Sequence, residues 1–361
     1  MTTYIMKKKL FKYILPAAMV AGFLCFFFYD ALHYITNIDD NFNDEYVSNL
    51  GVIEAMKLFF SNINGRWFSH VITAPAFAAL GHNYTFYAIY VTGMMLLFVA
   101  SISVLHKTYF KTFLKEDVKT QTSVVFAFVF TATLYFLLFV GRQEIWAWVS
   151  SANNHLLSVI LCIFLFSLLL QEKTSVIKTV SVFLLAAAIG GLNEVNAACC
   201  VLSIVGLFLL QKFYFPQLNF SKTNMLLAVI IIVASLSINV FSGGYESRMN
   251  SLQNFTLPQS IKNTVHTFAL PIMQYKLIVL RLFALLTFLF FLDTDFSKLS
   301  FTKRDKVITL GLLTIISVSF FLHCYILSDI VPARGEVWAY TLALFIIFVF
   351  VTNKKTVSVK T

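Results

Sequence analysis

The chain has 361 residues, of which 59% are hydrophobic and 12% charged, and its mean hydropathy is +0.80. This composition excludes an ordinary water-soluble globular protein and predicts a chain embedded in a lipid bilayer. The net charge of +10 is scattered over several short segments, so it does not indicate a nucleic-acid-binding face.

Continuous apolar runs cover nearly the whole chain. A helix needs about 20 apolar residues to cross the hydrocarbon core, whereas a transmembrane β-barrel has short alternating segments. We therefore predict an all-α integral membrane protein, one polytopic domain over residues 1–361, with about ten transmembrane helices. The expected spans are 11–36, 84–105, 123–141, 154–171, 176–192, 195–214, 224–241, 272–292, 307–327 and 337–352.

The lysine and arginine residues give the expected orientation. If the N-terminus lies in the cytoplasm, 19 of the 27 basic residues fall in cytoplasmic segments. Cytoplasmic loops carry such an excess of Lys and Arg, so both termini are expected in the cytoplasm. The first apolar run follows a basic start but has no small-residue cleavage site, which predicts an uncleaved first helix.

The first outer loop, residues 37–83, carries two adjacent carboxylates directly after the first span. In an extended loop, Asp39 and Asp40 point in different directions. One of them can then act as a general base toward a substrate hydroxyl, while the other binds a divalent cation or orients the loop. No other cofactor is indicated.

The same loop has two segments that are expected to lie flat on the membrane. Residues 45–60 place apolar side chains at helical spacing, which predicts an interfacial helix. A second interfacial segment, residues 66–80, follows the Asn64-Gly65-Arg66 turn, and Pro75 is expected to interrupt it.

Arginine is distributed differently from lysine. Four of the six arginines are expected outside, although 18 of the 21 lysines are cytoplasmic. A planar guanidinium grips phosphate through two hydrogen bonds, so these arginines are candidate phosphate ligands. The alternative is pairing with nearby acids such as Glu144, Glu246 and Glu336. The four outer arginines are Arg66, Arg142, Arg248 and Arg334.

Three outer motifs stand where a span re-enters the membrane. The residues 141–155 lead into the fourth span, 190–196 form a tight hairpin, and 332–338 lead into the tenth. Helix N-termini that point outward favour anions. For Asn193 and Glu194 the alternative is an N-cap followed by an acid that the helix dipole favours. The four tryptophans, all at outer positions, suit either an aromatic belt or sugar stacking.

Taken in order, these motifs resemble the GT-C superfamily of multi-pass membrane glycosyltransferases, in particular bacterial branches akin to O-antigen- and phage-type glucosyltransferases. The resemblance is carried by Asp39-Asp40, Asn64-Gly65-Arg66, Trp148-x-x-Ser151-x-Asn153, Gly191-x-Asn193-Glu194 and Pro332-x-Arg334. It extends along the chain at the level of topology.

The resemblance implies an enzyme of the bacterial cytoplasmic membrane that works in polysaccharide biosynthesis. Such enzymes transfer a sugar from a polyprenyl-phosphate donor to a glycan or lipid-linked acceptor on the outer face, by direct displacement. Asp39 or Asp40 would then be the base, and Arg66 and Arg334 would hold phosphate. Residues that would line the sugar site are Arg142, Glu144, Asn193 and Glu194. Many GT-C members also carry a soluble C-terminal domain, whereas this chain ends soon after the tenth span.

Two other functions remain open. A polymerase or ligase of lipid-linked glycans also places arginines in outer loops, but does not need the early acid pair. A lipid or sugar transporter would place ionisable residues along a path through the membrane. Apart from Lys276 and Arg281, the predicted spans are almost free of charge.

Overall fold

The computed structural model describes residues 2–33, 38–81, 83–214, 220–251, 256–273, 275–292, 310, 313–318, 320–322, 324 and 333–359. These residues form helices joined by short turns, and no β-strand occurs among them. The all-α prediction is therefore confirmed for the described part of the chain.

The helices are α1 (Thr2–Leu32), α2 (Ile38–Leu50), α3 (Val52–Leu58), α4 (Trp67–Leu80), α5 (Tyr84–Tyr109), α6 (Thr120–Leu137), α7 (Arg142–Trp146), α8 (Val149–Ser151), α9 (Leu157–Leu169), α10 (Val176–Leu192), α11 (Glu194–Tyr214), α12 (Lys222–Val240), α13 (Gly243–Ser251), α14 (Leu257–Met273), α15 (Tyr275–Phe291) and α17 (Ala333–Val359). Short π-helical turns are η1 (Phe59–Ile63), η2 (Phe110–Leu114) and η4 (Ala152–Leu156), and η3 (Phe139–Gly141) is a 3₁₀ turn.

Within the described residues, six helical segments are long and apolar enough to cross a membrane: Tyr13–Leu32, Thr85–Leu114, Thr120–Leu137, Val149–Leu169, Glu194–Phe213 and Lys222–Val240. They correspond to the predicted spans one to four, six and seven. The predicted spans five, eight and ten correspond to shorter apolar segments in α10, α15 and α17. The ninth, 307–327, is described only in part and corresponds to the shorter apolar segment Leu313–Leu322.

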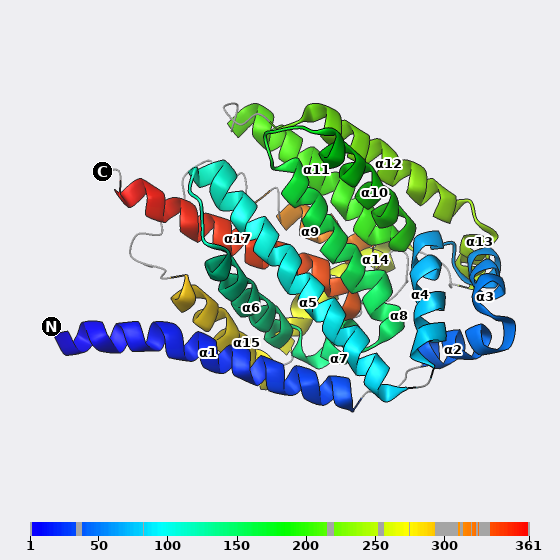
Figure 1. Ribbon diagram of the computed structural model, residues 1–361, viewed down its shortest axis with the longest axis horizontal. Helices are drawn as coiled ribbons and strands as arrows, with labels where there is room; N and C mark the ends of the chain where they lie inside the picture. Colours follow the sequence, from blue (N-terminus) through cyan, green and yellow to red (C-terminus); the bar gives the residue numbers. More distant parts are fainter. Residues whose placement is uncertain are drawn as a thin grey trace.

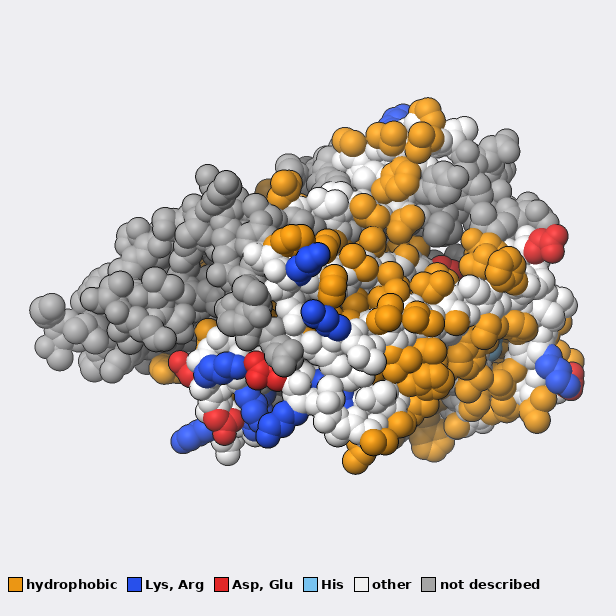
Figure 2. Space-filling model, turned by 90° about the horizontal axis from the view of Figure 1, so that it is seen from above, with side chains coloured by type: hydrophobic (Ala, Val, Ile, Leu, Met, Phe, Trp, Pro, Cys, Tyr) orange, Lys and Arg blue, Asp and Glu red, His pale blue; other side chains and the backbone are white. Residues whose placement is uncertain are grey.

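Different helices lie at the two ends of the long axis of the molecule. α1 begins and α17 ends at one end, whereas α2, α3, α4 and α13 lie at the other (Figure 1). Between them apolar side chains cover a broad surface, and the charged side chains lie mainly to either side of it (Figure 2). This distribution suits a bilayer that surrounds the middle of the molecule.

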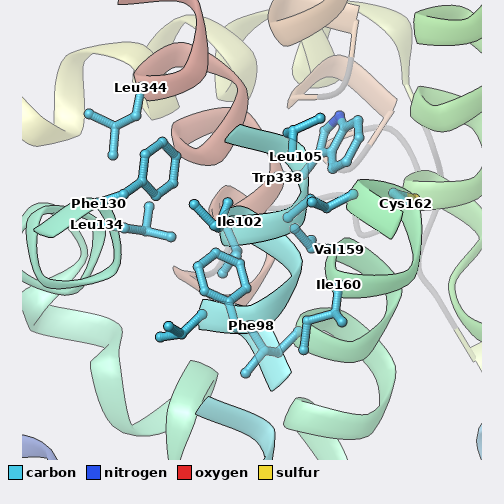
Figure 3. Packing of buried hydrophobic residues seen from close by; sticks show 14 of the residues in the cluster. Phe98, Ile102, Leu105, Phe130, Leu134, Val159, Ile160, Cys162, Trp338 and Leu344 are labelled. Carbon is cyan, nitrogen blue, oxygen red and sulfur yellow. The ribbon is translucent and has the colours of Figure 1, made fainter. Parts of the chain in front are cut away.

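The core lies where α5, α6, α9 and α17 meet. Phe98 and Ile102 from α5, Phe130 from α6, Val159 from α9 and Leu344 from α17 are among its buried residues (Figure 3). Large aromatic and branched side chains interdigitate there as in a water-soluble core, with the close packing that membrane helix bundles require.

The α2–α4 segment, residues 38–80, differs from the prediction in two respects. The helix expected over 45–60 breaks at Gly51, whose φ of 77° suits only glycine, and it starts earlier, at Ile38. The expected interruption at Pro75 is absent, because α4 is continuous from Trp67 to Leu80. Asp39 and Asp40 therefore lie in the first helical turn of α2, where carboxylates are favoured, and not in an extended loop.

Two glycines allow the α2–α4 segment to dock on the bundle. A Cβ on Gly191 of α10 would lie 2.6 Å from the Trp67 indole of α4. A Cβ on Gly65 would lie 1.8 Å from the side chain of Ser242, just beyond the end of α12. The docking is completed by the indole N–H of Trp67, which donates to Ser235 Oγ of α12 at 3.1 Å.

Candidate functional site

Asp40 anchors α2 to the start of the helix that runs from Val149 to Leu169. Its side chain is fully buried, and its Oδ1 accepts a hydrogen bond from the backbone N–H of Ser150 at 2.9 Å. The hydroxyl of Ser150 and the backbone N–H of Val149 also donate to this carboxylate. The N–H groups at a helix start have no intrahelical partner, so Asp40 caps this helix from outside the helix itself.

Asp39 has the opposite environment. Its side chain is exposed on the first turn of α2, and the neighbouring Asn43 donates from Nδ2 both to the Asp39 carbonyl at 2.7 Å and to Ser150 Oγ at 2.9 Å. One helix turn thus presents a buried carboxylate that fixes the segment and an exposed carboxylate that a solute can reach.

Arg66 and Glu194 form a buried ion pair between the α2–α4 segment and the start of α11. Arg66 donates from Nε to both carboxylate oxygens at 3.1 Å and from Nη2 to Oε2 at 2.8 Å. The side chains of the pair are 10% and 9% exposed. The edge of the guanidinium that includes Nε is therefore occupied by a carboxylate of the chain itself.

The hairpin between α10 and α11 contains one residue. Asn193 stands between the two helices, and its Oδ1 accepts from the backbone N–H of Asn196 at 3.0 Å. This is the geometry of an N-cap, which was the alternative interpretation of Asn193 in the sequence. Glu194 lies in the first turn of α11, where the helix dipole favours a carboxylate, and it also pairs with Arg66.

The π-helical turn η4 connects the Asp40 anchor to the Arg66–Glu194 pair. Asn153 accepts from the hydroxyl of Tyr90 and donates to Thr73 Oγ1 of α4 at 3.2 Å. On the other side, Asn196 of α11 donates to the carbonyl of His155 at 3.5 Å. The predicted residues Asp40, Arg66, Asn193 and Glu194 are thus joined through η4 in one polar layer. Such π-helical turns occur often at functional sites.

Arg142 is held by a residue that the sequence analysis did not single out. Its Nε and Nη2 donate to the carboxylate of Asp30 on α1 at 2.6 and 3.3 Å. Tyr135 donates to the same carboxylate at 3.0 Å, and the Arg142 guanidinium lies 4.1 Å from the centroid of the Phe139 ring. Asp30 is a carboxylate inside an apolar span, which is a signal for a functional or paired residue.

A second charged cluster involves Glu144, Arg281 and Glu336. Glu336 of α17 interacts electrostatically with Arg281 of α15 and Glu144 of α7, and all three side chains are half-buried. Arg281 also donates from Nε to the carbonyl of Leu137 at 3.0 Å. Glu144 is a predicted site residue, Glu336 was expected only as an acid that could pair with an outer arginine, and Arg281 had no predicted role. The side chain of Arg334 lies outside the described part of the structure.

Burial changes the titration of two groups in this layer. It raises the pKa of Asp40, against the hydrogen bonds from Ser150, and the nearby Asp44 acts in the same direction as burial. Burial lowers the pKa of His70 to about 4, and the charge of Arg66 adds to this effect. His70 is therefore neutral at pH 7, and its Nε2 donates to the Asn64 carbonyl at 2.9 Å.

Among the described residues, no group of three or more His, Cys, Asp or Glu side chains is placed to hold a metal ion. A divalent cation at Asp39 and Asp40 stays a prediction. No protein-family model, curated protein or solved structure matches the chain.

Proposed function

We propose that this chain is a glycosyltransferase of the bacterial cytoplasmic membrane, with a GT-C-like topology of about ten spans and both termini in the cytoplasm. It transfers a sugar from a polyprenyl-phosphate donor to a glycan or lipid-linked acceptor on the outer face. The proposal rests on the different burial of two adjacent carboxylates at the start of α2. Asp40 is buried against Ser150, and Asp39 is exposed next to it.

In this proposal Asp39 is the general base. The acceptor hydroxyl attacks the anomeric carbon, its proton passes to Asp39, and the bond from that carbon to the phosphate oxygen breaks as the lipid phosphate leaves. A direct displacement of this kind inverts the anomeric centre. Asp40 is a positioning residue, because its contacts with the helix start determine where Asp39 stands.

The charge that develops on the leaving phosphate requires fixed cationic or dipolar groups. Arg66 is the proposed phosphate ligand, and it would use the part of its guanidinium that is not directed at Glu194. Arg142 is committed to Asp30 through Nε and Nη2, which favours a supporting role for it. Arg334 keeps the phosphate-binding role that the resemblance implies.

The proposal is tested by sugar release from a synthetic polyprenyl-phosphate sugar, with purified protein in lipid nanodiscs. Asp39→Asn should lower kcat by about a hundredfold or more, in the range of general-base catalysis, at unchanged melting temperature. Glu54→Gln is the matched control, since Glu54 is an exposed carboxylate of α3 paired only with Lys57 among the described contacts. Full activity of Asp39→Asn would show that Asp39 is not the general base, and it would favour the polymerase or ligase alternative.

The transporter alternative gains one specific observation, the ion pair of Asp30 and Arg142 with its Tyr135 hydrogen bond. Paired charges of this kind line ion and substrate paths. Asp30, however, stands two residues before Leu32, the end of the apolar segment Tyr13–Leu32, and not at the middle of that segment. Uptake of sugar or scrambling of a fluorescent lipid by proteoliposomes, without sugar release, would make transport the better proposal.

A further inference from the structure

One face of α2 combines an exposed carboxylate with two aromatic rings. Asp39, Phe42 and Tyr46 follow one another at spacings of three and four residues, which places them on the same face of the helix. The Asp39 side chain is exposed, Phe42 is 38% exposed and Tyr46 is half-buried. The ring centroids of Phe42 and Tyr46 lie 4.4 Å apart. An aromatic surface therefore lies one helical turn from the exposed carboxylate.

The two rings rest on a buried aromatic residue. Phe59 of η1 is 1% exposed, and its ring centroid lies 6.4 Å from that of Phe42 and 6.0 Å from that of Tyr46. Its ring also packs against the imidazole of His70 on α4, at 5.3 Å between centroids. The Phe42–Tyr46 pair is thus fixed by the packed interior of the α2–α4 segment, so little ordering is needed when a ligand binds to its exposed side.

The charges on α2 indicate which ligand this face suits. The exposed charged side chains of the helix, Asp39 and Glu45, are both acidic, and α2 contains no lysine or arginine. Helices that lie on a lipid surface are usually rich in Lys and Arg on their polar face, so a bilayer is a poor partner for this one. An anionic ligand would be repelled by the two carboxylates. A neutral ligand with an apolar face and hydroxyl groups is the best match.

A saccharide has both of these properties. The C–H groups on one face of a sugar ring carry partial positive charge, which suits the negative face of an aromatic ring. Its hydroxyl groups donate hydrogen bonds, and an ionised carboxylate such as that of Asp39 accepts them. α2 also lies at the end of the molecule opposite both termini (Figure 1), which is the outer end in the predicted topology.

We propose that Phe42 and Tyr46 form a stacking surface for a neutral saccharide, the acceptor of the transfer reaction. A sugar ring stacks on the exposed side of Phe42, and Asp39 accepts a hydrogen bond from a hydroxyl group of the same glycan. This assignment rests on the proposed glycosyltransferase function and deepens it, because it places acceptor binding on α2 and makes the acceptor an uncharged glycan.

The first experiment measures binding in the absence of any donor. Fluorescently labelled protein in lipid nanodiscs is applied to an array of neutral, carboxylated and sulfated oligosaccharides. We expect the wild type to bind neutral members. Phe42→Leu keeps an apolar side chain but loses the ring, and should bind about three- to tenfold more weakly. Phe42→Tyr keeps the ring and should bind as the wild type does.

Phe86→Leu is the matched control. Phe86 is 49% exposed in the first turn of α5, so this variant loses an exposed ring outside α2 and should bind as the wild type does. Binding of the wild type to no oligosaccharide, or a preference for the anionic ones, overturns the proposal. Equal affinities of Phe42→Leu and the wild type, or equal losses in both leucine variants, also overturn it.

Asp39→Asn provides the second measurement if Phe42→Leu has a lowered melting temperature. Asp39 is exposed, so its replacement leaves the packing under the rings intact. The loss of a charged hydrogen-bond acceptor should weaken binding of the same oligosaccharides about tenfold. An unchanged affinity of Asp39→Asn would overturn the stacking surface beside it.

Failure of the proposed function is distinguishable from failure of the stacking surface. If the wild type binds neutral oligosaccharides through Phe42 but releases sugar from no polyprenyl-phosphate donor, the function is wrong and the stacking surface stands. The oligosaccharide that binds most tightly on the array then serves as the acceptor in the sugar-release assay. If sugar is transferred to it and Phe42→Leu leaves its KM unchanged, the function stands and the stacking surface is wrong.

Discussion

Asp40 shows how a single carboxylate can define the geometry of a candidate site without touching a substrate. Its burial is complete, and the backbone N–H groups of Val149 and Ser150 converge on it. Removal of the acid group without removal of the acceptor oxygen therefore tests what the charge itself contributes.

The pH dependence of Asp40→Asn can be stated with its sign. Since burial raises the pKa of Asp40 in the folded state, the folded protein binds a proton more tightly than the unfolded chain. Stability then falls as pH rises from the ordinary carboxyl pKa through the raised one. Asp40→Asn should lack this fall and be at least as stable at pH 7, as measured by melting temperature from pH 4 to 8.

A large loss of stability of Asp40→Asn at pH 7 would contradict that prediction, because it would mean that the ionised form is the favoured one. Asp39→Asn is the comparison, since Asp39 is exposed and its replacement removes a carboxylate from the same helical turn without disturbing the buried one.

Arg66 and Glu194 should behave as a buried pair whose halves depend on each other. Arg66→Met removes the guanidinium that pairs with the buried Glu194 carboxylate, a change that typically costs about 3–5 kcal/mol. The double variant Arg66→Met and Glu194→Met removes both charges and should recover much of the loss, as measured by unfolding in detergent. If the losses of the two single variants simply add in the double variant, the pair is not coupled.

At the scale of elements, the apolar spans were the most predictable feature, because about 20 apolar residues have few alternatives to a membrane helix. The one-residue turn at Asn193 also follows from local sequence, since Gly-Gly before Asn-Glu combines a close approach with an N-cap. The break at Gly51 instead depends on a positive φ, which the amphipathic pattern around it does not reveal.

The contacts of the candidate site could not be predicted in the same way. The partners in each decisive interaction are more than 100 residues apart: Asp40 with Ser150, Arg142 with Asp30 and Arg66 with Glu194. The sequence indicated which residue types had functional potential, and for arginine it offered both phosphate binding and pairing with acids. The structure gives pairing for Arg66 and Arg142, though with Glu194 and Asp30, which are not the acids named for pairing.

Gly191 and Gly93 form a matched pair of helical glycines that tests the docking of α4 on α10. In Gly191→Ala the new Cβ would lie 2.6 Å from the Trp67 ring, and such overpacking costs about 1–3 kcal/mol. In Gly93→Ala no atom lies within 4 Å of the new Cβ, so alanine should stabilise α5 by up to about 1 kcal/mol. Opposite shifts in melting temperature are expected, and equal shifts would mean that the Trp67 contact does not limit the packing.

At the scale of the whole molecule, the separation of termini from the α2–α4 segment allows a direct test of orientation. With both termini in the cytoplasm, Lys57→Cys on α3 should react with a membrane-impermeant maleimide in intact cells. Lys173→Cys, in the turn before α10, should react only after lysis. Both lysine side chains are exposed, and Cys25 is the one exposed cysteine among the five, so a Cys25→Ser background avoids unwanted labelling. The reverse pattern would invert the topology.

The ion pair between Arg66 and Glu194 also constrains the order in which the protein can be assembled as the ribosome makes it. The partners are 128 residues apart in the chain, which corresponds to roughly 6–26 seconds of synthesis at 5–20 residues per second. During that interval the Arg66 guanidinium has been synthesised, but its partner Glu194 has not. In a truncated nascent chain that stops before residue 194, protease should therefore cleave the α2–α4 segment. In a chain extended past residue 194, the segment should be protected.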